Sequence, residues 1–187
     1  DAWADPEGEA DSWHSEKLIR LPGGFQCYQP PADAPDIAPS PCLENGYMTF
    51  GSCNNLAKIT PQAIDLWAQI LTAVPASRML LKAKGLEDKG ARAHLLDAFA
   101  GHGITEDRLD LRSWISGSSP LAIYNHMDIA LDTFPYNGAT TTCETLWMGV
   151  PTLTLLGDHH AGRVGYSLNA RVGLEDWVAA SPQAYVA

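Results

Sequence analysis

The chain has 187 residues, of which 45% are hydrophobic, and this is enough to bury one main core with room for a small appendage. Its formal net charge of -10 disfavours general binding to nucleic acids and anionic lipid surfaces, which carry charge of the same sign. No apolar run reaches the roughly 18 to 20 residues of a membrane span, and no signal-peptide pattern occurs. We therefore expect a cytoplasmic globular protein, and the first residue, Asp1, suggests a piece of a longer chain.

Residues 1–46 differ from the rest of the sequence in charge and in proline content. They hold nine acidic and two basic side chains, a net charge of -7, and seven of the 13 prolines. They show little of the apolar periodicity that marks helices and strands, and proline-rich segments of this kind are typical of extended connectors. We predict an acidic, proline-rich connector over residues 1–46 and a folded domain over residues 47–187.

From residue 47 onward, short apolar runs alternate with amphipathic segments. This alternation predicts β–α–β units and a parallel sheet, so the expected fold class is α/β. The predicted strands are YMTFGS (47–52), RMLLKA (78–83), DLRSWI (110–115), MDIALDTF (127–134) and TLTLL (152–156).

Capping residues mark the helices between these strands. Threonine or serine followed by proline is favoured at a helix start, and glycine is favoured just beyond a helix end. Helices are accordingly expected to begin at Thr60–Pro61 and Ser119–Pro120, and to end at Gly101 and Gly149. After Pro61, apolar side chains repeat at spacings of three and four, as on the buried face of a helix.

The segment DTFPYNGATTTCE, residues 132–144, follows a predicted strand and opens a predicted helix. Backbone N–H groups are free at a helix start, and the helix dipole favours negative charge there. A glycine lets a ligand approach the backbone closely, and three threonine hydroxyls add donors. We interpret the loop as a phosphate cradle formed by Asn137, Gly138, Thr140, Thr141 and Thr142. The alternative is an ordinary N-terminal cap made by the same hydroxyls.

Charged residues lie near this cradle and in a second loop. Glu144 follows Thr140 by four residues, and its carboxylate can accept hydrogen bonds from a ribose diol or can simply offset the helix dipole. The loop FGSCNNLAKITP, residues 50–61, follows the first predicted strand and contains Asn55 and Lys58. Lysine supplies a point charge for a diphosphate, although a solvated surface lysine is the ordinary explanation for a single position. Two polar loops at one edge of a parallel sheet favour a nucleotide site over capping alone.

Other reactive residues are expected to be structural. The four cysteines lack the C-x-x-C spacing of a zinc module and are expected to be reduced thiols. The alternative is a disulfide between Cys27 and Cys42, which flexibility of the loop could bring together. His159 and His160 are adjacent and so do not face one site on a helix, and no metal site is predicted. Arg163 is expected to pair with a nearby carboxylate. Asp132 is expected to order the threonine loop by accepting backbone N–H bonds.

Five quoted segments resemble one known family. FGSCNNLAKITP, LDTFPYNGATTTCETLWMGVPTLTLLG and GRVGYSL resemble the C-terminal catalytic lobe of the O-linked N-acetylglucosamine transferase family, particularly its bacterial SPINDLY-type members. DAWADPEG and LPGGFQCYQPP resemble the part that precedes this lobe. The resemblance covers nearly the whole chain. It implies a Rossmann-like parallel sheet with helices on both faces, as in the C-terminal lobe of GT-B type glycosyltransferases.

The resemblance also implies a metal-independent, inverting glycosyltransferase that moves a sugar from a nucleotide to serine or threonine hydroxyls of proteins. Lys58, Thr140 and Thr141 would stabilise the leaving diphosphate, Glu144 would hold the ribose, and Asn55 would help position the phosphate end. The protein acceptor would bind a missing N-terminal lobe and upstream tetratricopeptide repeats, so the isolated chain is expected to be inactive. No cofactor is expected.

Two positions depart from the family pattern. Ala139 stands where animal members have a histidine before the first threonine pair, and Pro120 stands where many members have another histidine. These departures leave the donor open between UDP-N-acetylglucosamine, the family default, and the GDP-fucose that some SPINDLY-type members use. Two alternatives belong to other functional classes: a lobe that binds nucleotide or a protein without catalysis, and another nucleotide-sugar enzyme such as an epimerase.

Overall fold

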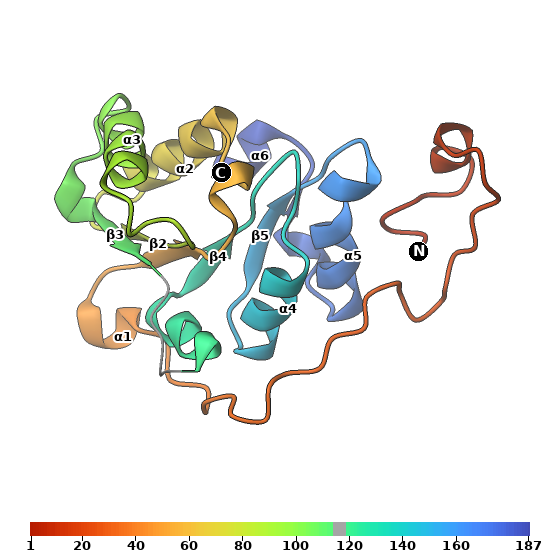
Figure 1. Cartoon of the computed structure of the whole chain (residues 1–187), viewed down its shortest axis with the longest axis horizontal. Coiled ribbons are helices and arrows are strands. Elements are labelled where there is room, and N and C mark those ends of the chain that lie inside the picture. The colour runs from red at the N-terminus through yellow and green to blue at the C-terminus, as the bar shows by residue number, and fades with distance from the viewer. Residues whose placement is uncertain (114–118) are drawn as a thin grey trace.

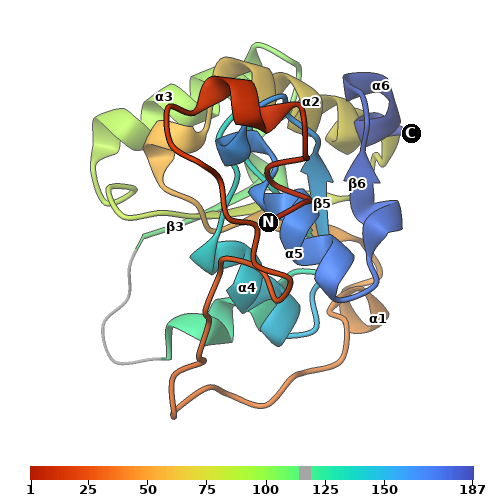
Figure 2. The same ribbon diagram turned by 90° about the vertical axis from the view of Figure 1, so that its right-hand side faces the viewer.

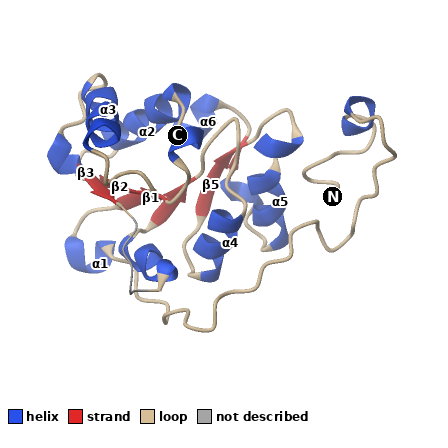
Figure 3. Cartoon of the chain, viewed as in Figure 1, coloured by secondary structure: helices blue, strands red, loops and turns tan. Residues whose placement is uncertain are grey.

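The computed structural model describes residues 1–113 and 119–187 and has a parallel β-sheet at its centre (Figures 1 and 3). Among the described residues the sheet contains six strands in the order β3-β2-β1-β4-β5-β6, and every neighbouring pair is parallel. The strands are β1 (Thr49–Ser52), β2 (Arg78–Lys82), β3 (Leu109–Arg112), β4 (Ile129–Leu131), β5 (Thr152–Leu155) and β6 (Val178–Ala179). The predicted α/β class is therefore confirmed.

Five of these strands coincide with predicted apolar runs, but some are shorter. The third predicted run extends to Trp114 and Ile115, which lie outside the described residues. The fourth run ends early because β4 stops at Leu131 and residues 132–134 already belong to the loop that follows. Strand β6 has only two residues, which is too short to show an apolar pattern in the sequence.

The helices begin and end close to the predicted capping residues. The Thr60 hydroxyl accepts a hydrogen bond from the Ala63 N–H at 3.1 Å and so caps the first long helix. Gly149 lies beyond the end of the threonine helix with φ of +73°, a conformation that glycine adopts without strain. The α-helices are α1 (Cys42–Asn45), α2 (Pro61–Ala73), α3 (Lys89–Ala100), α4 (Thr140–Trp147), α5 (Val164–Arg171) and α6 (Pro182–Val186).

The segment that Ser119 and Pro120 open is a 3-10 helix, Pro120–His126, rather than an α-helix. The other 3-10 turns among the described residues are Ala10–Trp13, Leu56–Lys58, Glu106–Arg108, His160–Gly162 and Glu175–Trp177.

Helices cover both faces of the sheet, as the resemblance implied. Helices α2, α3 and α6 lie on one face, and α1, α4 and the 3-10 helix Pro120–His126 lie on the other (Figure 3). Strand β2 shows the division, because successive side chains of a strand point to opposite faces. Met79 and Leu81 belong to the larger core cluster with Trp67, whereas Leu80 belongs to the smaller cluster with Tyr124.

The first 41 residues form an extended segment that runs along the outside of α4 and α5 (Figures 1 and 2). The segment is anchored at Asp1, whose carboxylate accepts hydrogen bonds from the Ser167 hydroxyl at 2.6 Å and from Arg171 at 3.0 Å. At its other end, Asp128 accepts a hydrogen bond from the Cys42 N–H at 2.9 Å. The segment thus contacts the domain at both ends, and its proposed connection to another lobe stays a prediction.

Within the part of the chain that the structure describes, no helix combines the length and the apolar character needed to cross a bilayer.

Candidate functional site

The order of the strands reverses between β1 and β4. From β1 the chain moves outward through β2 and β3, and from β4 it moves outward in the opposite direction through β5 and β6. At such a reversal the loops that leave the carboxyl ends of the two central strands diverge and leave a crevice, which is where open α/β sheets bind ligands. These loops are residues 53–60 and residues 132–139, the two polar loops identified in the sequence.

Asp132 organises the loop between β4 and α4. Its carboxylate is buried and accepts hydrogen bonds from the N–H of Thr133 at 2.8 Å, the N–H of Gly138 at 2.7 Å and the hydroxyl of Thr154 at 2.9 Å. Burial raises the pKa of Asp132 to about 7, although these three bonds and the charge of Lys58 oppose the increase. The prediction that Asp132 orders the threonine loop is confirmed.

Gly138 lies where side chains from both loops converge. A Cβ atom at this position would come within 2.5 Å of Thr141 Oγ1, 2.9 Å of Thr142 Oγ1 and 3.1 Å of Asn54 Oδ1. Each of these distances is shorter than an ordinary contact, so a larger residue would displace the threonines or the loop. The glycine therefore allows the hydroxyls and the backbone to lie close together at the start of α4.

Asn137 is fully buried and uses both ends of its side chain inside the protein. Its Nδ2 donates to the Thr133 carbonyl at 2.9 Å, and its Oδ1 accepts from the Gly165 N–H at 3.2 Å. Its backbone carbonyl accepts a hydrogen bond from Lys58 at 2.8 Å. The structure thus gives Asn137 a role in shaping the loop, and a direct contact of its side chain with nucleotide stays a prediction.

Lys58 reaches from the first loop to the second. Its ammonium group lies 2.8 Å from the Asn137 carbonyl and 4.1 Å from the centre of the Tyr136 ring, a cation–π contact. Burial lowers the pKa of Lys58, and the negative charge of Asp132 opposes this change. An ammonium group carries three N–H donors, so the bond to Asn137 leaves donors for a ligand. Tyr136 was not predicted as a site residue, because its one signal in the sequence was its place next to the Asn-Gly pair.

The two adjacent asparagines of the first loop have different roles. Asn55 is exposed, and its Oδ1 accepts from the Ala57 N–H at 3.0 Å as the N-cap of a 3-10 turn. Asn54 is buried, and its Oδ1 accepts from the Thr141 hydroxyl at 3.1 Å. Asn54 therefore joins the two loops, whereas the sequence analysis selected only Asn55 as a site residue.

The start of α4 has no side-chain cap at its N-cap residue, Ala139. Among the described residues no threonine hydroxyl accepts a hydrogen bond from the first N–H groups of the helix, so the alternative explanation, an ordinary cap by these hydroxyls, is not observed. Thr140 is exposed and Thr141 is half-buried, so both lie near the surface of the crevice. Thr142 is only 2% exposed, which places its hydroxyl beneath the other two.

Glu144 lies one turn into α4 and is half-buried. Its Oε2 accepts a hydrogen bond from the Tyr124 hydroxyl at 2.6 Å. Tyr124 belongs to the 3-10 helix Pro120–His126, and no pattern in the sequence connected it with Glu144. The structure therefore brings Lys58, the threonine hydroxyls and Glu144 to one edge of the sheet, on loops and helices that follow β1 and β4.

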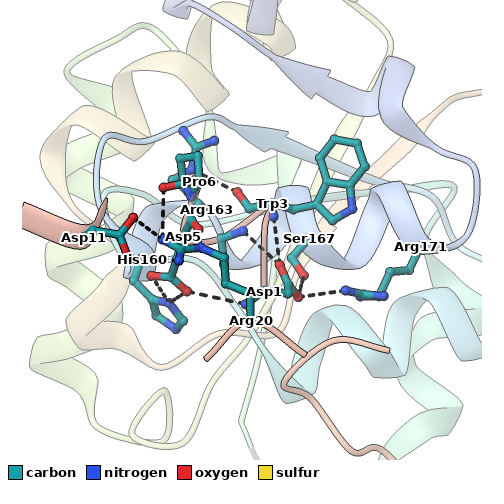
Figure 4. Close-up of polar contacts among 11 residues, drawn as sticks. Asp1, Trp3, Asp5, Pro6, Asp11, Arg20, His160, Arg163, Ser167 and Arg171 are labelled. Carbon is teal, nitrogen blue, oxygen red and sulfur yellow. Dashed lines mark hydrogen bonds and ion pairs between the residues drawn. The ribbon is translucent and has the colours of Figure 1, made fainter. Parts of the chain in front are cut away.

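The N-terminal segment covers the loop between β5 and α5 (Figure 4). His160 lies 2.9 Å from the Asp5 carboxylate, and His159 stacks against Trp13 with ring centres 4.7 Å apart. Arg163 donates to the carbonyls of Trp3 at 3.0 Å and Gly157 at 3.3 Å, so within the described part of the chain its partners are backbone oxygens and not the predicted carboxylate. Among the described residues no group of three potential metal ligands occurs.

Comparison with known proteins identifies relatives for this arrangement. Residues 41–187 match the model of the family described as glycosyl transferase family 41. Over its whole length the chain is 48% identical to a probable UDP-N-acetylglucosamine–peptide N-acetylglucosaminyltransferase SPINDLY of Solanum lycopersicum, and it covers 20% of that protein. An Arabidopsis thaliana protein of the same name is 45% identical and is covered to the same extent.

A solved structure gives the same result for the fold. A Thermobaculum terrenum O-GlcNAc transferase mutant matches 98% of this chain with a TM-score of 0.91 and 41% identity, and the match covers 34% of that chain. The resemblance to the O-linked N-acetylglucosamine transferase and SPINDLY family is therefore confirmed, and so is the fold. The two SPINDLY relatives are plant proteins and give no support to a bacterial origin. The chain spans about a fifth of their length.

Proposed function

Because this chain belongs to glycosyl transferase family 41, we propose that it is the donor-binding part of an enzyme that glycosylates proteins. The proposed reaction transfers a sugar from a nucleotide to serine or threonine hydroxyls, with inversion and without a metal ion. The relatives are named as UDP-N-acetylglucosamine–peptide N-acetylglucosaminyltransferases, which supports UDP-N-acetylglucosamine as donor. GDP-fucose is the alternative donor, and the base decides between them.

One observation carries this proposal: Lys58 and the uncapped start of α4 meet at the reversal point of the sheet. A nucleoside diphosphate leaving group gains negative charge as the bond to the sugar breaks. The Lys58 ammonium, the first N–H groups of α4 and the Thr140 hydroxyl are donors already in place before the reaction, whereas the Thr141 hydroxyl donates its hydrogen to Asn54. Donors of this kind stabilise charge as it develops, without the cost of reorganising them.

The same arrangement gives Glu144 a role distinct from that of the phosphate donors. A carboxylate repels phosphate but accepts hydrogen bonds from the hydroxyls of a ribose. Its position one turn into α4 separates it from the helix start, so ribose and diphosphate can lie along one helix.

The two departures from the family pattern, Ala139 and Pro120, leave the other proposed donor contacts in place. Ala139 is half-buried at the start of α4, and Pro120 begins the 3-10 helix that carries Tyr124. Neither substitution removes Lys58, Thr140 or Glu144. A catalytic enzyme is therefore favoured over a lobe that only binds nucleotide or a protein.

A thermal-shift screen of UDP, GDP, UDP-N-acetylglucosamine and GDP-fucose tests the proposal. A ligand that binds only the folded chain stabilises it by about 2.7 kcal/mol at a concentration one hundred times its Kd. We expect UDP and UDP-N-acetylglucosamine to raise the melting temperature. If the donor is GDP-fucose instead, GDP and GDP-fucose will raise the melting temperature. The absence of a shift with all four compounds would contradict the proposal.

A further inference from the structure

A buried tyrosine fixes one side of the Glu144 carboxylate. Tyr124 is 1% exposed, and its hydroxyl donates to Glu144 Oε2 at 2.6 Å. Within the part of the chain that the structure describes, the Glu144 carboxylate makes this one hydrogen bond, and its other oxygen, Oε1, has no partner. The carboxylate is thus held at one oxygen and open at the other.

The surroundings of Tyr124 keep it a rigid donor. Its ring packs in the smaller core cluster with Leu121, Met127 and Met148, so it cannot follow the carboxylate to other positions. Burial, together with Cys53 and the Glu144 carboxylate, raises the pKa of the Tyr124 phenol far above its ordinary value of about 10. The phenol therefore stays protonated and donates its single hydrogen to Glu144.

A second tyrosine lies near the same carboxylate. The hydroxyl of Tyr28, in the N-terminal segment, is shielded from solvent and has no hydrogen-bond partner among the described residues. Burial and the nearby charge of Glu144 raise the pKa of Tyr28. The extended segment thus brings a solvent-shielded hydroxyl near the carboxylate that Tyr124 holds, and hydrogen bonds to a charged group strengthen where water is excluded.

We propose that Tyr124 is a positioning residue for the nucleotide: by holding Oε2 it aims Glu144 Oε1 at a ribose hydroxyl and sets a preference for ribonucleotides over deoxyribonucleotides. This inference rests on the proposed function, because it takes Glu144 as the ribose contact. A carboxylate that is already oriented loses less conformational freedom when the ligand binds. Without the Tyr124 hydroxyl, Glu144 keeps its charge, but its carboxylate is no longer held in one orientation.

Isothermal titration calorimetry on the full chain tests this directly, with UDP, GDP and the 2′-deoxy and 3′-deoxy analogues of each. The wild-type chain should bind the preferred ribonucleotide roughly ten- to hundred-fold more tightly than at least one deoxy analogue, because a hydrogen bond to a charged group is lost. Tyr124→Phe keeps the ring and removes the donor. It should lower this ratio by about three- to ten-fold, through weaker binding of the ribonucleotide and unchanged binding of the analogue.

Two further variants separate positioning from stability. Ser77→Ala removes another buried hydroxyl, which donates to the Val74 carbonyl at 2.7 Å just before β2, at the edge of the sheet opposite the crevice. It should lower the melting temperature and leave the ratio of affinities unchanged. Glu144→Asp keeps the charge but withdraws the carboxylate from Tyr124, so it should lower the ratio even if Tyr124→Phe fails to fold.

The outcomes distinguish this inference from the proposed function. A wild-type chain that binds neither diphosphate overturns both. A wild-type chain that binds ribonucleotides and deoxy analogues equally overturns the role of Glu144 and with it the inference. Strong ribose preference that survives in Tyr124→Phe and Glu144→Asp overturns the inference alone. A lower ratio in both Tyr124→Phe and Glu144→Asp, with Ser77→Ala equal to wild type, supports it.

Discussion

Lys58 is held in the crevice by two contacts that differ in kind. The Asn137 carbonyl fixes one N–H of its ammonium group, and the Tyr136 ring faces the charge at 4.1 Å. Both partners belong to the loop before α4, so the lysine side chain is directed towards the helix start and away from bulk water. The flexible side chain of a surface lysine is thereby restricted before a ligand binds, which lowers the entropy cost of binding.

We expect Lys58→Ala to weaken binding of a nucleoside diphosphate by about 1.5 to 3 kcal/mol, the range for a hydrogen bond to a charged group. Calorimetric titration with the diphosphate that the thermal screen selects measures this change. Lys89→Ala is the matched control, because Lys89 is exposed at the start of α3, which follows β2, whereas the crevice loops follow β1 and β4. Equal diphosphate affinity in the Lys58 variant and the control, with both folded, would remove Lys58 from the site.

Single residues also show how far the sequence alone could define this site. Lys58, Thr140 and Glu144 are found because their chemistry and their place after strands are both visible in the sequence. Asn54 and Asn55 carry the same side chain, and only the folded loop decides which one binds Thr141. Tyr124 reaches Glu144 from another element across the smaller core, and such a contact leaves no local pattern.

At the scale of elements, the loop between β4 and α4 depends on one buried carboxylate. Asp132 accepts two backbone N–H groups of the loop and one hydroxyl of β5. Asp132→Asn keeps an oxygen for the two N–H groups, and its amide N–H can donate to the Thr154 hydroxyl. The variant is therefore expected to keep the loop while removing the charge.

The pH dependence of stability should reveal this charge. Burial raises the pKa of Asp132 to about 7 in the folded chain, against about 3.9 for an unfolded aspartate. Between these pH values the folded chain binds more protons than the unfolded chain, so Asp132 lowers the free energy of unfolding as pH rises from about 4 to about 7. In urea unfolding over this range, Asp132→Asn should lose less stability than wild type. Parallel profiles for the two proteins would contradict the raised pKa.

The secondary structure follows the sequence where periodicity or capping is strong. Helix α2 begins at its predicted cap because the Thr60 hydroxyl accepts a hydrogen bond from the free N–H of Ala63. Pro61 fits the first position of the helix because it has no N–H that would be left without a partner there. Strand β6 was not predicted, because Val178 and Ala179 become a strand only by pairing with Thr154 and Leu155. The 3-10 geometry of Pro120–His126 is likewise set by packing against the sheet, which local propensity does not encode.

At the scale of the whole molecule, the acidic N-terminal segment is bound to the domain despite its lack of regular structure. Asp1 and Asp5 contact Arg171 and His160 (Figure 4). In the middle of the segment, Tyr28 lies near enough to Glu144 of α4 for the carboxylate charge to raise its pKa. The segment therefore belongs to the surroundings of the proposed donor site. Its composition predicted an extended course, but the contacts along that course depend on positions far apart in the sequence.

The chain alone should bind the nucleotide and yet transfer no sugar. It covers 20% of its SPINDLY relatives and 34% of the O-GlcNAc transferase structure, and the crevice residues supply one wall of the proposed donor site. A donor sugar that remains in water lacks the contacts that align it with an acceptor hydroxyl, and alignment supplies a large part of the rate of a two-substrate reaction.

We therefore expect a radiolabelled donor to give no labelled acceptor protein with residues 1–187, although the same chain shifts its melting temperature with the nucleotide. A longer protein that contains this chain together with the regions present in its relatives should label the acceptor, and Lys58→Ala in that protein should reduce labelling because the leaving diphosphate loses a donor. If residues 1–187 bind the nucleotide without transferring sugar and the longer protein transfers it, donor binding belongs to this chain and acceptor binding to another part of the protein. Transfer by residues 1–187 at the rate of the longer protein would show that one side of the donor suffices for catalysis.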